Sequence, residues 1–383
     1  MVLPDYTKNN LINLLSSLIA GCGGKNPYPL LDPRLTEEIK NTKNVILFII
    51  DGLGADSVQR LGKKSFLFQQ QDSTLTTVFP STTAAAITAT YTGKTPQEHG
   101  AVAWYMNLKE FGAVVALLPF VTRQKQPLHL LKERPLYFPP SIFTQISRPS
   151  HIVLRKKLLQ STYNQFFITK KVKQWSYTNL RGLFSSLRKA ITSNQRKKYI
   201  YAYWGGFDDY SHKLGKHHHK TQHHLQEIET RLAQLVKKVQ GTDTLILITA
   251  DHGQIVTTKK TRIILNNHPK LKECLSLPVC GESRAAFCYV YPHKTQQFEN
   301  YVTHKLKEYC TLYRAADLAA HNWFGLGEEH PRFRDRIGDY ILIAKGNYVL
   351  RDFLINEEPN QNIGFHGGIS EEEMLIPLIK IKV

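Results

Sequence analysis

Several aspartate and histidine residues of the sequence have the types and the spacing of ligands to a divalent metal ion. Asp208 and His212 are four residues apart, so on one helical turn their side chains face the same direction and can share an ion. Asp251 and His252 are adjacent and can serve one ion or two neighbouring ions. Oxygen and imidazole ligands without a thiolate suit zinc, and manganese is an alternative. The further candidates are Asp51 and His366.

Each of these residues also has a structural explanation when it is taken alone. Asp51 precedes Gly52 and could belong to a simple turn, while a single His212 or His366 could be a hydrogen-bonded or surface histidine. The stretch "ADHG" around Asp251 follows an apolar run and is more specific. The whole set is more specific than any member, and it predicts a metal site.

A cluster of hydroxyl groups, Ser81, Thr82 and Thr83, lies between Pro80 and an alanine-rich run. The stretch "TTAAAITATYTG" predicts a helix that begins at this cluster, and a helix cap needs only one of the three hydroxyls. The free N–H groups at a helix N-terminus also suit a phosphate. A metal ion beside a hydroxyl would lower its pKa and make it a nucleophile. A capping role and a nucleophilic role are therefore compatible here.

Three short apolar runs predict the elements that position these side chains. They are "NVILFII" (44–50), "YIYAYW" (199–204) and "TLILITA" (244–250), rich in β-branched and aromatic residues and without alternation. Such runs are typical of parallel strands that are buried on both faces. A helical pattern between them, as in 223–241, predicts an α/β sheet, whose sites form beyond the carboxyl ends of its strands. A carboxylate follows each run at that end: Asp51, Asp208 and Asp251.

The length of 383 residues allows one elaborated domain or two, and we expect a single domain, 1–383, with two inserted sections. We expect a basic, cap-like insert at 105–198 and a smaller α+β insert at 256–360. The formal net charge is +19, and no acidic residue lies between Glu133 and Asp208. This basic insert is either an ordinary basic surface or a region that attracts an anionic substrate, a polyanion or a membrane headgroup layer.

The cysteine content and the apolar runs bear on the location of the protein. Five scattered cysteines without a CxxC pair indicate free thiols in a reducing compartment. No apolar run reaches the ~18 residues of a membrane span. The apolar stretch at 10–24 lacks the basic start of a signal peptide and predicts an N-terminal helix. We therefore expect a cytoplasmic protein.

The series of motifs resembles the alkaline phosphatase superfamily, most closely its type I phosphodiesterase/nucleotide pyrophosphatase branch. The motifs are "FIIDGLG", "FPSTTAAAITATYTGKTPQEHG", "DDYSHKLG", "TADHGQ" and "GFHGG", and they follow the family's order over most of the chain. The resemblance implies a mixed, mostly parallel sheet sandwiched by helices. It also implies two divalent ions, with zinc expected and manganese as the alternative.

Carried over by position, the resemblance implies a ligand set for each ion. One ion would be held by Asp51, Thr83, Asp251 and His252, and the other by Asp208, His212 and His366. Counting back from Gly93 of "YTG" places the family's nucleophile on Thr83. That hydroxyl would attack phosphorus in line and form a phosphothreonine intermediate, which water then hydrolyses.

Three positions depart from the nucleotide pyrophosphatase pattern. Ala86 stands where these enzymes carry an asparagine, Ala84 replaces an aromatic residue, and Ser211 replaces the glycine before the metal histidine. These departures count against a nucleotide substrate and leave the metal residues intact. The nucleophile motif of sulfatases, Cys-x-Pro-x-Arg, is absent from the sequence. Arg284 could meet an anionic substrate, although an arginine at a strand edge is more often structural.

The sequence thus predicts a metal-dependent phosphohydrolase that cleaves phosphodiesters or nucleotide pyrophosphates, with a phosphate-ester substrate. One alternative is a phosphomonoesterase or a mutase-like phosphotransferase of the same superfamily. Another is a non-catalytic protein that binds anions or a partner through the basic insert. All seven expected ligand and nucleophile positions hold competent residues, which favours an enzyme.

Overall fold

A mixed, mostly parallel sheet forms the centre of the molecule. The computed structural model describes residues 1–128, 136–355, 357–359 and 361–383. Among them, seven strands form this sheet in the order β2 (Gln71–Thr76), β18 (Leu375–Lys382), β9 (Thr244–Thr249), β1 (Asn44–Ile50), β8 (Lys198–Trp204), β6 (Ser150–Arg155) and β7 (Lys173–Tyr177). Neighbouring strands from β9 through β1, β8 and β6 to β7 run parallel to one another, and β18 is antiparallel to both β9 and β2.

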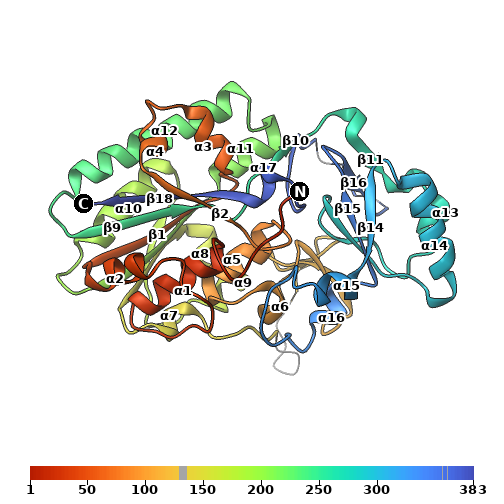
Figure 1. Cartoon of the computed structure of the whole chain (residues 1–383), viewed down its shortest axis with the longest axis horizontal. Coiled ribbons are helices and arrows are strands. Elements are labelled where there is room, and N and C mark those ends of the chain that lie inside the picture. The colour runs from red at the N-terminus through yellow and green to blue at the C-terminus, as the bar shows by residue number, and fades with distance from the viewer. Residues whose placement is uncertain (129–135, 356, 360) are drawn as a thin grey trace.

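The three apolar runs of the sequence are the central strands β1, β8 and β9, which confirms their prediction. Every residue of β1 and of β9 is buried, because helices cover both faces of the sheet. Figure 1 shows α12 (His219–Lys238), α3 (Ala55–Leu61) and α4 (Phe66–Gln69) above the sheet, and α1 (Leu11–Gly21), α2 (Pro33–Asn41) and α7 (Ile142–Gln145) below it. The apolar face of α12 buries Leu225, Ile228, Leu232 and Leu235, each worth about 1.5–3 kcal/mol.

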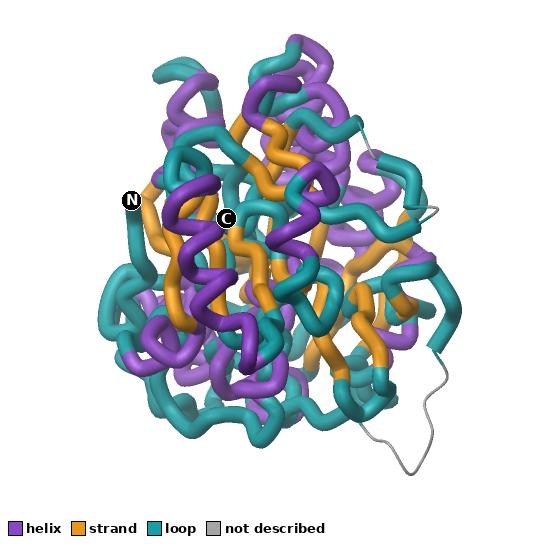
Figure 2. Tube along the Cα trace, turned by 90° about the vertical axis from the view of Figure 1, so that its right-hand side faces the viewer, coloured by secondary structure: helices purple, strands orange, loops and turns teal. Residues whose placement is uncertain are grey.

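A second sheet lies beside the first, to the right in Figure 1. Within the described residues its strand order is β14 (Cys310–Arg314), β15 (Tyr340–Ala344), β13 (Ala285–Cys288), β12 (Cys280–Gly281), β3 (Tyr105–Leu108), β4 (Ala113–Ala116) and β5 (Val121–Thr122). Figure 2 views the molecule from this end, with helices in front of the strands. Segments 105–122 and 280–344, far apart in the sequence, are thus joined in one sheet.

The stretch expected as one basic insert, 105–198, is divided between the two sheets. Its first part supplies β3, β4 and β5 to the second sheet, while its last part supplies β6 and β7 to the central sheet. Residues 129–135 of this stretch lie outside the described residues. Within the described residues, no helix combines the length and the hydropathy that crossing a bilayer requires.

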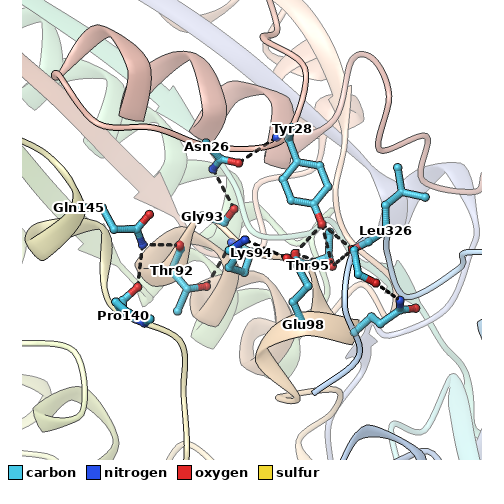
Figure 3. A network of polar contacts seen from close by, with 12 residues as sticks. Asn26, Tyr28, Thr92, Gly93, Lys94, Thr95, Glu98, Pro140, Gln145 and Leu326 are labelled. Atoms are coloured by element: carbon cyan, nitrogen blue, oxygen red, sulfur yellow. Dashed lines mark hydrogen bonds and ion pairs between the residues drawn. The ribbon is translucent and has the colours of Figure 1, made fainter. Parts of the chain in front are cut away.

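Helix α5 (Thr83–Thr92), which begins at the hydroxyl cluster, is anchored at its far end by a polar network (Figure 3). Asn26 donates to the carbonyl of Gly93 (3.0 Å), and Gln145 donates to the carbonyl of Thr92 (2.9 Å). Gly93 ends the helix in the left-handed conformation, at a φ of 69°. These bonds fix the helix whose first residue is Thr83.

Candidate active site

The seven residues predicted for the site come together at the carboxyl ends of the central strands. Asp51 follows β1 directly, and β1 is in parallel register with both β8 and β9. Helix α11 (Gly206–Leu214) begins two residues after β8 and carries Asp208 and His212. Because parallel strands end at the same edge, these side chains converge with Asp251 and His252, which follow β9.

His366 reaches the same place from the other end of the chain. It follows β17 (Gly364–Phe365), which pairs with β10 (Ile255–Val256) just after β9. Its ring stacks on that of His252 with the centroids 3.6 Å apart and the planes at 13°. The sequence could place His366 here only through the resemblance, because no local pattern links these segments.

Asp51, Asp251 and His252 form the first group of candidate metal ligands. Nε2 of His252 lies 3.4 Å from Oδ1 of Asp51 and 3.5 Å from Oδ2 of Asp251. Within the described residues, both of these carboxylate oxygens are buried without a hydrogen bond. A buried carboxylate oxygen that lacks a partner is costly. The donor set and the two unpartnered oxygens therefore fit a divalent cation.

The second ligand set that the resemblance implies is Asp208, His212 and His366. Nε2 of His212 lies 3.2 Å from Oδ2 of Asp208, and the rings of His212 and His366 are 5.1 Å apart between centroids. Asp208, His366 and His252 also offer ligand atoms that all lie within 4.8 Å of one another. His252 therefore adjoins both groups, and the division of ligands between two ions stays a prediction.

The three histidines share one arrangement of their ring nitrogens. Nδ1 of His212 lies 2.8 Å from the carbonyl oxygen of Gly364. Nδ1 of His252 lies 3.0 Å from the carbonyl oxygen of Gly253, and Nδ1 of His366 lies 3.0 Å from that of Ser81. A carbonyl oxygen only accepts hydrogen bonds, so Nδ1 donates in each neutral ring and Nε2 carries the free electron pair. This arrangement leaves Nε2 of each ring free of its proton and therefore able to bind a metal ion.

The hydroxyl of Thr83 is the member of the cluster that contacts the first group. Its Oγ1 lies 3.0 Å from Nε2 of His252. Thr82 occupies the cap position of α5, but its hydroxyl donates to Glu282 (2.6 Å), and the hydroxyl of Ser81 donates to the carbonyl of Gly368 (2.8 Å). Thr82 thus stands at the cap position without a capping bond from its side chain.

The buried carboxylates repel one another at this edge of the sheet. Burial, together with Asp251 and Asp208, raises the pKa of Asp51 well above its usual value. Tyr203 donates a hydrogen bond to Asp51, and Gln254 donates one to Asp208. Divalent cations would remove this repulsion. Sequence reasoning missed Tyr203 and Gln254, because their roles depend on tertiary contacts.

A cavity of about 440 Å³ opens beside Thr83 and extends to residues on and near the second sheet. Its wall includes Trp104, Tyr105, Arg123, Glu282 and Arg351, none of which the sequence singled out. Glu282 accepts hydrogen bonds from Thr82 and from the amide of Trp104 (2.7 Å). Its pKa is raised to about 7 by burial, which these hydrogen bonds only partly oppose.

Arg284, which the sequence offered for contact with an anion, has a structural role instead. Its Nε and one terminal nitrogen donate to the two carboxylate oxygens of Glu373, at 3.0 and 2.8 Å. Both residues are buried, and Arg284 is not among the residues that line the cavity. The pair holds β13 to the C-terminal segment.

Comparisons with known proteins found a matching family and solved structures with a similar fold. The family of type I phosphodiesterases/nucleotide pyrophosphatases matches residues 45–369. No curated protein sequence matches the chain significantly. The structure is similar to murine ectonucleotide pyrophosphatase/phosphodiesterase 5, solved as an inactive form with AMP, at 16% identity and a TM-score of 0.66, over 87% of each chain.

Two further solved structures share the fold. Human ectonucleotide pyrophosphatase/phosphodiesterase 5 is 16% identical, with a TM-score of 0.67, over 88% of this chain and 87% of the other. Phosphonoacetate hydrolase from Sinorhizobium meliloti 1021, solved with phosphonoformate, is 15% identical, with a TM-score of 0.63, over 88% of this chain and 90% of the other.

Proposed function

The chain belongs to the type I phosphodiesterase/nucleotide pyrophosphatase family, and from that premise we propose that it hydrolyses phosphodiesters through Thr83 at a site for two divalent ions. Family membership supports the coarser activity, metal-dependent hydrolysis of phosphoryl compounds. The observation that carries the finer proposal is the position of Thr83 Oγ1, 3.0 Å from His252 and on the wall of the cavity.

The proposed reaction has two displacements at phosphorus. Thr83 Oγ1 forms a bond to phosphorus while the bond to the departing ester oxygen breaks, and the proton of the hydroxyl ends on that oxygen. Water then adds to the phosphothreonine, the bond to Oγ1 breaks, and the hydroxyl is restored. Bound divalent ions, for which we propose zinc, supply electrostatic stabilisation of the attacking and departing oxygens.

The residues of the chain have distinct roles in this proposal. Asp51, Asp251 and His252 would hold one ion with Thr83 beside it, as the unpartnered oxygens Asp51 Oδ1 and Asp251 Oδ2 suggest. The other ion would be held by Asp208, His212 and His366. The carbonyls that accept from each Nδ1 keep the imidazoles oriented before metal binds.

The test compares a nitrophenyl phosphodiester with the corresponding monoester, using metal-stripped protein that is reloaded with zinc or manganese. Thr83→Ala should lower kcat by at least about a hundredfold, the size of effect seen when a catalytic group is lost. Thr83→Ser keeps a hydroxyl and should retain part of the activity. The exposed Thr230→Ala on α12 is the matched control and should match the wild type.

Each outcome of this assay supports or contradicts one of the alternative functions. Metal-dependent diester hydrolysis that is lost in Thr83→Ala would support the proposal. A preference for the monoester would instead favour a phosphomonoesterase or a mutase-like phosphotransferase. Full activity without Thr83 would contradict its role as nucleophile. No turnover by the metal-loaded wild type would favour a non-catalytic protein that binds anions through the basic residues of 105–198.

A further inference from the structure

Two arginines on the cavity wall, Arg123 and Arg351, differ in their partners. Arg123 donates to the carbonyl oxygen of Val279 (2.7 Å) and pairs with the carboxylate of Glu357 (3.2 Å). Arg351 is only 8% exposed, yet no hydrogen bond or ion pair from any described part of the chain reaches its guanidinium. Arg351 is thus a buried cation whose N–H donors have no acceptor among the described residues.

Two aromatic rings hold Arg351, the last residue of β16 (Val349–Arg351), in this position. Its guanidinium carbon lies 4.9 Å from the centroid of the Phe353 ring and 5.2 Å from that of Phe365. Such contacts contribute about 0.5–2 kcal/mol but accept none of the N–H groups in a conventional hydrogen bond. Both arginines line the cavity, and Nε of Arg123 is buried without a hydrogen-bond partner among the described residues.

Three acidic residues on the wall, Asp352, Glu357 and Glu282, have other hydrogen-bond or ion-pair partners, although the charge of Glu357 still acts on Arg351. Asp352 accepts from Lys272 (2.8 Å) and from the amide of Val279 (3.1 Å). Glu357 is the carboxylate that pairs with Arg123. Glu282 accepts from Thr82 and the amide of Trp104, as described above. Burying an unpaired charge is costly, so an anion that enters the cavity would find Arg351 available.

Arg351 lies close to the candidate metal site. The Phe365 ring that it contacts meets the ring of His212 edge to face, at 88° and 6.4 Å between centroids. One aromatic ring therefore separates the guanidinium from an expected metal ligand. Thr83 lines the same cavity as Arg351, and the aromatic residues Trp104 and Tyr105 also belong to its wall.

We propose that Arg351 binds a second anionic group of the substrate, a carboxylate or a phosphoryl group, while the reacting phosphoryl group lies at Thr83. The substrates of this class are small organic phosphate esters or phosphonates whose two anionic ends are separated by about the width of an aromatic ring. This inference rests on the proposed function and names the substrate class of the same site. A guanidinium suits it, because its planar set of N–H groups pairs with carboxylate and phosphate oxygens.

The experiment uses the metal-loaded full-length protein and three nitrophenyl benzyl phosphodiesters. Their benzyl rings carry a 4-carboxylate, a 4-phosphono group or a neutral 4-carboxamide, so the first two distinguish the kinds of anion and the third removes the charge. Arg351→Gln removes the cation and Arg351→Lys retains a charge. Arg314→Gln, which removes an exposed charge from β14, is the matched control.

For the wild type, we expect kcat/KM for at least one anionic diester to exceed that for the carboxamide by about 10- to 100-fold, the range for a charge-assisted hydrogen bond. Arg351→Gln should abolish this preference and leave carboxamide hydrolysis within about threefold, since that substrate does not use the cation. Arg351→Lys should keep part of the preference, and Arg314→Gln all of it.

Two results would overturn the inference while leaving the proposed function intact. One is equal hydrolysis of all three diesters by the wild type, a comparison that needs no variant to fold. The other is an equal loss on all three diesters in Arg351→Gln, which would indicate a structural role. If none of the three diesters is hydrolysed in a manner that depends on metal and Thr83, the proposed function fails, and this inference fails with it.

Discussion

The hydroxyl oxygen of Thr83 lies 3.0 Å from Nε2 of His252, although the two residues are 169 positions apart in the sequence. The contact joins the first turn of α5 to the carboxyl end of β9. It selects Thr83 from the three neighbouring hydroxyls, because Ser81 and Thr82 donate to Gly368 and Glu282 instead.

Asp208→Asn should lower the amount of metal that the protein retains. The substitution replaces a carboxylate oxygen, 3.2 Å from His212 Nε2, with a neutral amide, which is a poorer ligand for a divalent cation. Metal analysis after dialysis is expected to fall from about two ions per chain to about one, as the two-ion ligand sets require. Asp209→Asn changes the charge equally at the next residue and should retain both ions. Equal loss in the two variants would contradict the assignment of Asp208.

Glu282→Gln should change how the stability of the metal-free protein depends on pH. Burial raises the pKa of Glu282 from 4.5 to about 7 in the folded protein. A carboxyl whose folded pKa is raised stabilises the fold fully below pH 4.5 and loses this contribution as the pH rises through about 7. Urea unfolding at pH 5 and pH 8 should therefore show a smaller loss of stability in Glu282→Gln than in the wild type. The same loss in both proteins would argue against this buried ionisation.

Glu373→Gln should destabilise the fold strongly at neutral pH. It leaves the buried Arg284 without its carboxylate, and breaking such a pair costs about 3–5 kcal/mol. Burial opposes ionisation of Glu373, but Arg284 and the hydrogen bonds from Ser370 and the Gly368 amide together outweigh it and lower the pKa below 4.5. The contribution is therefore present above that pH and is lost as the pH falls below it. Urea unfolding should show the difference from the wild type narrowing at low pH. Glu371→Gln, an exposed change two residues away, is the control and should have little effect.

The central sheet could be predicted from the sequence because its strands have a local signature. Buried parallel strands are continuous apolar runs, and β1, β8 and β9 match the runs at 44–50, 199–204 and 244–250. The second sheet could not be predicted in the same way. It pairs β3 with β12, which are separated by more than 170 residues, and short strands carry no signal of their distant partners.

In the candidate site, too, some residues could be predicted from the sequence and others could not. Asp51, Asp208 and Asp251 follow predicted strands, so their convergence could be inferred from topology. The availability of Arg351 depends instead on which acidic residues pair with Arg123 and Lys272. The sequence offered Arg284 for an anion, and only the contact with Glu373 shows that its guanidinium is already paired.

The measurement that tests the central claim most directly is the stereochemical course at phosphorus. A phosphorothioate diester of one configuration would be hydrolysed in ¹⁸O-labelled water by the metal-loaded enzyme, and the configuration of the product would be determined. Attack by Thr83 followed by attack of water gives two in-line displacements, so the account predicts overall retention of configuration. Inversion would mean a single displacement by water and would contradict the role of Thr83 as nucleophile.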